Sequence, residues 1–166
     1  MATEQSILEN KLNKAIASFI RQEIKKFHFG TKSVITYEGF LSNKMLIIEA
    51  IKAGIPYSLF DLIKHYTTFT ENEWAGFLDI STKSLQRYRD TTGHYFKSLQ
   101  SEKIIEMAEV TKTGLDVFGD REKLKLWLNT PNFALGNLKP IELLKDSYGK
   151  ELVMGELTRV SHGILV

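Results

Sequence analysis

Apolar residues recur at intervals of three and four along most of this 166-residue chain, and that spacing limits its fold more than any other feature. Side chains at such intervals share one face of an α-helix, so each run predicts an amphipathic helix with its apolar face buried. The first run predicts a helix over 6–27, with the apolar positions Ile7, Leu8, Leu12, Ile16, Phe19, Ile20 and Ile24. We therefore expect an all-α protein.

The next segment interrupts this pattern. Val34, Ile35 and Tyr37 are residue types that favour strands, and they predict a short extended piece. Ser42 is then expected to cap another helix, which stops near Gly54 because glycine favours helix ends. We interpret residues 1–54 as an N-terminal helical extension that supplies packing and oligomer contacts.

Composition narrows the class of protein. The chain contains no cysteine, which excludes a disulfide framework and a thiolate metal site and favours a reducing cytoplasm. No apolar block resembles a signal peptide or is long enough to span a bilayer, so no membrane association is expected. The net charge of +2 is too small to hold nucleic acid by bulk charge. Any DNA binding must come from a local cluster of cations, doubled in a homodimer.

Residues 55–97 are expected to form a DNA-binding region. Ser58 weakly predicts the start of a helix that runs to His65. The following segment, 70–89, reads as two short helices joined by a tight turn. Thr70 and Glu73 have the spacing of a capping box at the start of the first helix.

The rest of this segment fits a helix-turn-helix. Ala75 is small where two helices would cross, and Asp79 falls in the turn, where aspartate tolerates left-handed backbone. Ser81 is positioned to cap the second helix. The residues expected to point inward are Trp74, Phe77, Leu78, Leu85 and Tyr88.

The outward residues of the second helix are those that a recognition helix needs. Gln86 suits adenine, and Arg87 suits guanine or a phosphate group. The expected DNA-binding residues are Ser81, Thr82, Lys83, Gln86, Arg87 and Arg89. The alternatives are an ordinary helical hairpin with solvated charges, or a fold of this kind kept only as a dimerisation scaffold.

The third region, 98–166, predicts several more helices. A long helix is expected over 98–117, with Gly114 marking a bend or an early stop. Asp120 is expected to cap the next helix. Pro140 suits the first turn of a helix that would end at Gly149. A last helix would carry Leu152, Val153, Leu157 and Val160.

This C-terminal region, 118–163, resembles the toxin-binding domain of the Xre/MbcA/ParS antitoxin family, and residues 70–89 resemble the Xre-type helix-turn-helix. The chain departs from these patterns at Asp79, where glycine is common, and at Lys139, where Ser or Thr usually caps the helix. The matching pieces are Phe118-Gly119-Asp120, Trp127-Leu128, Thr130-Pro131-Asn132, Ala134-Leu135-Gly136, Pro140-Ile141-Glu142-Leu143-Leu144, Gly149 and His162-Gly163.

The resemblance implies a function and its partners. A member of this family would neutralise a toxin encoded beside it, usually one of the RES fold that consumes or transfers ADP-ribose from NAD. It would also repress the shared promoter by binding operator DNA. We expect the last helix and the tail to cover the mouth of the toxin's active site. The expected toxin-binding residues are Lys150, Val153, Leu157, Arg159, Val160, Ile164, Leu165 and Val166.

Other functions remain open at this stage. The chain could be a stand-alone transcription regulator whose C-terminal half dimerises or senses a ligand. It could also be a purely structural interaction protein whose DNA-binding surface has lost its function. The apolar face of the last helix could also pack only on Trp127 and Leu143 within the chain and make no contact with a partner. The four histidines form no pair at metal-ligand spacing, and no glycine-rich phosphate loop is present. We therefore expect no catalysis, no metal and no cofactor.

Overall fold

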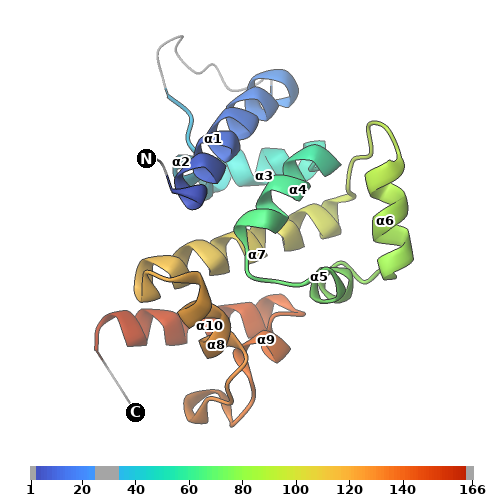
Figure 1. The fold of residues 1–166 in the computed structure, drawn as a ribbon. Helices are drawn as coiled ribbons and strands as arrows, with labels where there is room; N and C mark the ends of the chain where they lie inside the picture. Colours follow the sequence, from blue (N-terminus) through green and yellow to red (C-terminus); the bar gives the residue numbers. More distant parts are fainter. Residues whose placement is uncertain (1–2, 25–33, 164–166) are drawn as a thin grey trace. The chain divides into compact units, whose positions relative to one another are not determined.

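The computed structural model describes residues 3–24 and 34–163, and this part of the chain is built from helices (Figure 1). It contains no strand within those ranges, only two isolated bridges, so the predicted all-α class is confirmed. The α-helices are α1 Glu4–Glu23, α2 Tyr37–Leu41, α3 Lys44–Ala53, α4 Tyr57–Tyr66, α5 Glu71–Phe77, α6 Thr82–Asp90, α7 Ser98–Phe118, α8 Arg121–Leu128, α9 Pro140–Leu143 and α10 Ser147–Ser161, and the 3₁₀ helix η1 is Phe133–Leu135.

The described residues form two compact units. The N-terminal unit contains the residues up to Tyr66 together with Lys83–Ile105. The C-terminal unit contains Thr67–Thr82 and the residues from Glu106 onward. The predicted functional regions 1–54, 55–97 and 98–166 do not coincide with these two units. They stay a prediction.

In the N-terminal unit, α1 is the helix on which α2, α3 and α4 pack. Its residues Leu12, Ile16 and Ile20 have no exposed surface, as the helical spacing predicts. Phe40 from α2 and Phe60 from α4 are also buried in this unit. Burying five such side chains contributes on the order of 10 kcal/mol to the free energy of unfolding, before conformational entropy is subtracted.

The predicted ends of these helices needed correction. Residues 34–36 are irregular, and the helix α2 begins at Tyr37, because the Thr36 side chain accepts a hydrogen bond from the Gly39 backbone N–H at 3.0 Å. Ser42 ends α2, and the cap of α3 is Asn43, whose side chain accepts from the Leu46 N–H at 3.2 Å. The first helix ends at Glu23; the rest of its predicted range, 25–27, lies outside the described residues.

In the C-terminal unit, two glycines are packing positions, where helix breaks were predicted. The helix α7 continues through Gly114 to Phe118, and a Cβ at Gly114 would overlap the side chain of Leu124 on α8. Gly149 does not end a helix: α9 stops at Leu143, and Gly149 lies in the first turn of α10. A Cβ there would overlap the carbonyl oxygen of Leu143.

We expect Gly149→Ala to destabilise the protein by about 1–3 kcal/mol, because the new methyl group meets rigid backbone. The matched control is Gly155→Ala on the same helix, where a Cβ would have no neighbour within 4 Å. That substitution should stabilise the protein by roughly 0.5–1 kcal/mol through the better helix propensity of alanine. Thermal and urea unfolding measure both changes, and equal effects at the two positions would contradict this account of Gly149.

Candidate functional site

The helix α5 begins with the predicted capping box. The Thr70 backbone N–H donates to Glu73 Oε2 at 2.7 Å, and the Glu73 N–H donates to Thr70 Oγ1 at 3.2 Å. Inside the C-terminal unit, Trp74 is fully buried and its ring lies edge-on to Phe69 and Phe77. The two hydrogen bonds satisfy backbone groups that the helix start would leave unpaired, and the ring contacts hold α5 in place.

A tight turn follows α5. Asp79 adopts left-handed backbone with φ of 54°, as predicted for the residue at this turn. The Ile80 N–H donates to the carbonyl oxygen of Ala75 at 3.0 Å, which closes the end of the helix. The helix α6 then begins at Thr82, directly after Ser81.

The helix α6 presents a polar face with several cations. Leu85 is fully buried, whereas Lys83, Gln86, Arg87 and Arg89 are exposed. Ser81, just before the helix, is exposed too, and Thr82 is half-buried. Their interactions leave the arginines at the surface: the Arg87 guanidinium lies 5.7 Å from the Tyr88 ring centre, and Arg89 Nε lies 3.3 Å from Asp90 Oδ1. All six predicted DNA-contact residues therefore lie in or beside one short segment, and none is fully buried.

A stack of aromatic rings in the N-terminal unit holds the end of α6. The His94 ring lies parallel to the Tyr88 ring, with centres 3.8 Å apart, and edge-on to Phe96 at 5.0 Å. The His94 carbonyl oxygen accepts a hydrogen bond from the Tyr57 N–H at 2.9 Å. Its Nε2 is buried and finds no hydrogen-bond partner in the described part of the chain. Desolvation lowers the pKa of His94 below its usual 6.5, since burial disfavours the charged ring.

The helix α10 divides its apolar residues between two faces. Val153 and Leu157 are fully buried, so these two predicted toxin contacts support the helix from inside. Tyr148 and Leu152, four residues apart, are 84% and 58% exposed and share the outer face. Tyr148 was not among the predicted contacts, although its spacing of four residues from Leu152 indicates that the two share a helix face.

The remaining predicted toxin contacts lie nearer the surface. Lys150 Nζ is 3.5 Å from Glu109 Oε1 on α7, and Arg159 Nη1 is 3.1 Å from Glu156 Oε2. Val160 is half-buried. Ile164, Leu165 and Val166 lie outside the described residues.

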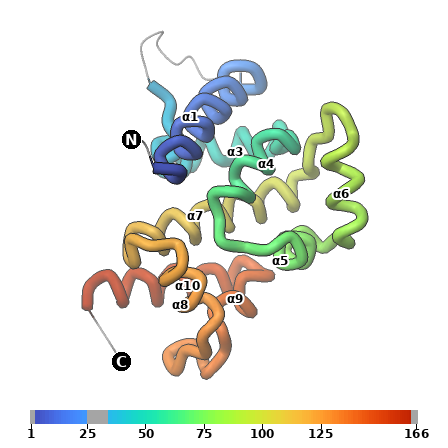
Figure 2. The backbone as a smooth tube through the Cα atoms, in the orientation of Figure 1, coloured from blue at the N-terminus to red at the C-terminus, as the bar shows by residue number. Residues whose placement is uncertain are grey.

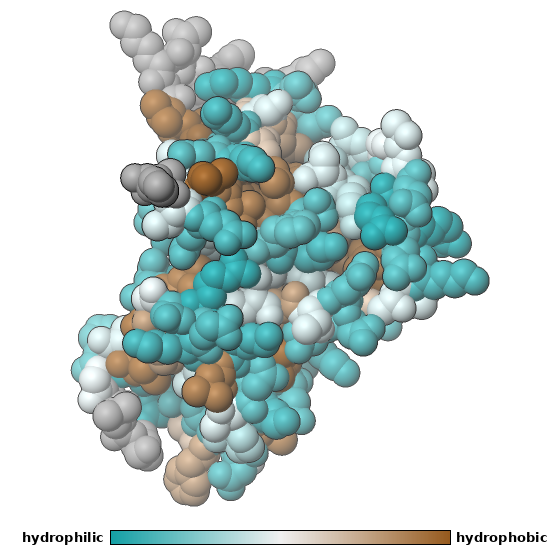
Figure 3. Space-filling model, viewed as in Figure 1, coloured by the Kyte–Doolittle hydropathy of each residue, from teal (hydrophilic) through white to brown (hydrophobic). Residues whose placement is uncertain are grey.

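Three more large apolar side chains of the C-terminal unit are exposed and were not predicted as contacts. They are Leu126 on α8, Phe133 in η1 and Leu138 in the loop that follows. On the face shown in Figure 3, hydrophobic residues reach the surface over the C-terminal part of the chain. Exposed apolar groups are typical of surfaces that bind other proteins where they form a contiguous patch.

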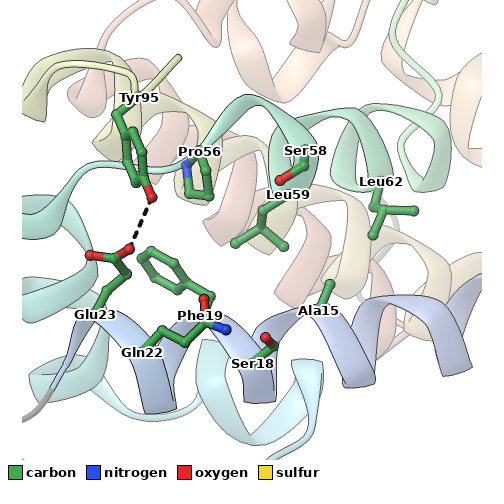
Figure 4. Close-up of a pocket in the computed structure, with 10 residues that line it drawn as sticks. All are labelled: Ala15, Ser18, Phe19, Gln22, Glu23, Pro56, Ser58, Leu59, Leu62 and Tyr95. Carbon is green, nitrogen blue, oxygen red and sulfur yellow. Dashed lines mark hydrogen bonds between the residues drawn. The ribbon is translucent and has the colours of Figure 1, made fainter. Parts of the chain in front are cut away.

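A groove of about 310 Å³ lies in the N-terminal unit between α1 and α4 (Figure 4). Its lining mixes apolar and polar side chains: Ala15, Ser18, Phe19, Gln22, Glu23, Pro56, Ser58, Leu59, Leu62 and Tyr95. At one end the Tyr95 hydroxyl donates to Glu23 Oε1 at 2.9 Å, and this bond raises the pKa of Tyr95 above its usual 10. No histidine is among the lining residues, so neither Ser18 nor Ser58 is paired there with a histidine base.

Within 3–24 and 34–163, no group of three or more His, Cys, Asp or Glu side chains is placed to hold a metal ion. None of the helices described there is long and apolar enough to cross a membrane.

The C-terminal part of the chain matches a known protein family. Residues 113–163 match the antitoxin Xre/MbcA/ParS C-terminal toxin-binding domain. This span begins near the end of α7 and includes α8, η1, α9 and α10. No curated protein matches the chain. The family match supports an antitoxin role and a toxin as partner.

The lowered pKa of His94 predicts a loss of stability in acid. The unfolded chain binds a proton near pH 6.5 and the folded chain only at lower pH, so the free energy of unfolding falls below about pH 6.5. We expect His94→Phe, which keeps a ring against Tyr88, to reduce this loss. Urea unfolding of both proteins at about pH 7.5 and about pH 5.5 measures it. The same loss in wild type and variant would show that His94 has no part in it.

Proposed function

We propose that this chain is an antitoxin that neutralises a toxin protein by binding it through the C-terminal unit. The observation that carries the proposal is the match of 113–163 to a toxin-binding domain. In support, the elements of this span expose large apolar side chains, among them Phe133, Tyr148 and Leu152. Apolar surface of this kind supplies most of the free energy of association when a partner covers it.

The proposed partner is a RES-type toxin that consumes NAD. This subtype rests on the resemblance of the chain's motifs to the Xre/MbcA/ParS family. We assign the chain no catalytic activity, and its action on the toxin is inhibition by binding.

The proposed mode of inhibition is that α10 and the tail cover the mouth of the toxin's active site. Leu152 on the outer face of α10, and the half-buried Val160 near the end of the helix, would lie against the toxin. Arg159, whose side chain is 41% exposed, would keep its ion pair with Glu156 and face acidic groups of the partner or the place of a phosphate-bearing substrate. Ile164, Leu165 and Val166 would extend this apolar contact to the chain end.

We further propose that α5 and α6 form a helix-turn-helix that represses the chain's own operon. The left-handed Asp79 and the exposed Lys83, Gln86 and Arg87 support this proposal. Two copies in a homodimer would place their α6 helices in successive major grooves of a palindromic operator. The alternative is a stand-alone regulator whose C-terminal half dimerises or senses a ligand.

Co-expression with the protein of the neighbouring reading frame tests the antitoxin function. We expect the full chain to restore growth, to preserve cellular NAD and to co-purify with that protein. Truncation after His162 should weaken inhibition roughly tenfold or more, because it removes three apolar side chains from the interface. Circular dichroism of the shortened chain serves as the folding control. Failure of the full chain to bind or protect would overturn the antitoxin function; a folded truncation that inhibits equally well would remove only the tail from it.

Arg87→Ala tests the DNA-binding role. We expect it to weaken binding to the chain's own promoter by about 1–3 kcal/mol if Arg87 contacts a base in bidentate fashion. The matched control is Arg21→Ala, which removes the same charge from an exposed position on α1. Gel-shift titration at two salt concentrations measures both. No shift with the wild-type protein, even at low salt, would leave α5 and α6 as a scaffold.

A further inference from the structure

The loop between α8 and α9 is closed by several hydrogen bonds. The Asn132 N–H donates to the Leu138 carbonyl at 3.0 Å, and the Asn137 N–H donates to the Asn132 carbonyl at 2.9 Å. The Asn132 side-chain oxygen accepts from the Ala134 N–H at 2.9 Å. Gly136 and Asn137 both adopt left-handed backbone, with φ of 70° and 63°. These bonds join the two ends of the loop 132–138. Figure 2 shows the path of the chain between α8 and α9.

This ordered loop carries an exposed aromatic ring. Leu135 points inward and is 9% exposed, so it anchors the loop to the C-terminal unit, in which η1 contacts α10. Phe133, two residues earlier, is 75% exposed. Its ring therefore adds little to the stability of the chain itself. A side chain presented on a fixed loop loses less conformational entropy on binding than one on a mobile segment.

Two exposed leucines, one on α8 and one at the end of the loop, indicate the chemistry of the partner. Leu126 on α8 and Leu138 are 70% and 46% exposed. Each has an exposed lysine beside it in the sequence, Lys125 and Lys139. A partner that covers this surface would offer an apolar pocket with acidic groups at its rim.

We propose that Phe133 is the anchor residue that inserts into an apolar, acid-rimmed pocket of the toxin. This inference rests on the proposed antitoxin function. The toxin is the occupant because the whole loop lies within 113–163, the span that matches a toxin-binding domain. The loop bonds of Asn132 orient the ring before the partner arrives.

The experiment measures the affinity of the purified full chain for the product of the neighbouring reading frame by calorimetry or surface plasmon resonance. Phe133→Ala should weaken binding about tenfold or more, as expected for a buried aromatic anchor. Its melting temperature should stay that of the wild type. The matched control is Leu99→Ala, which truncates an 82% exposed apolar side chain outside the matched span and should not change the affinity.

A second pair of variants tests the role of the loop. Asn132→Ala removes the acceptor of the Ala134 N–H and should weaken binding several-fold with Phe133 unchanged. Asn132→Asp keeps an acceptor oxygen and should bind nearly as the wild type does. Equal affinity of Asn132→Ala and wild type would show that the loop bonds do not prepare the ring.

The outcomes separate this inference from the function on which it rests. If the wild-type chain does not bind the toxin, the antitoxin function and the inference both fail. If wild type binds and Phe133→Ala binds equally well, only the inference fails. If Phe133→Ala leaves toxin binding intact but dissociates a homodimer in analytical ultracentrifugation, the pocket belongs to a second copy of the chain and the inference is overturned.

Discussion

The C-terminal unit depends on the close approach of α10 to the backbone at the end of α9. Any side chain at Gly149 would overlap the Leu143 carbonyl, so only glycine allows the first turn of α10 to lie there. The Asp146 carboxylate accepts from the Gly149 N–H at 2.7 Å and fixes the same turn. Once this turn is placed, Val153 and Leu157 face the core and Tyr148 and Leu152 face solvent. The surface offered to a partner follows from this contact.

Local signals in the sequence predicted local structure well. The capping box of Thr70 and Glu73, the left-handed turn at Asp79 and the cap at Asp120 were all confirmed, because each depends on hydrogen bonds or backbone preferences within a few residues. The helix start at Pro140 was confirmed for the same reason, although Lys139 contributes no side-chain cap there. In place of that cap, the Glu142 carboxylate accepts from the Lys139 N–H at 2.8 Å.

Features that depend on distant neighbours could not be predicted in the same way. Glycine signals both a helix end and a close contact, and at Gly149 only the position of Leu143 decides between them. The spacing of apolar residues in the last helix likewise did not show which of them would be buried, because burial depends on the elements that pack against the helix. Phe133 lies outside any periodic run, and its exposure depends on the hydrogen bonds that close its loop.

The cationic side chains of α10, Lys150 and Arg159, already form ion pairs within the chain. Apolar groups should therefore contribute more than new ion pairs to the affinity for a partner. The side chains of Lys150 and Glu109 are only 17% and 29% exposed and already lie 3.5 Å apart. A toxin that drew Lys150 away would leave Glu109 partly buried without this cation, which offsets most of the gain from a new ion pair. Phe133 and Tyr148 carry no such penalty, because covering a ring removes apolar surface from water and breaks no ion pair. Affinity for a partner should therefore come mainly from the exposed rings, while the lysines set its orientation.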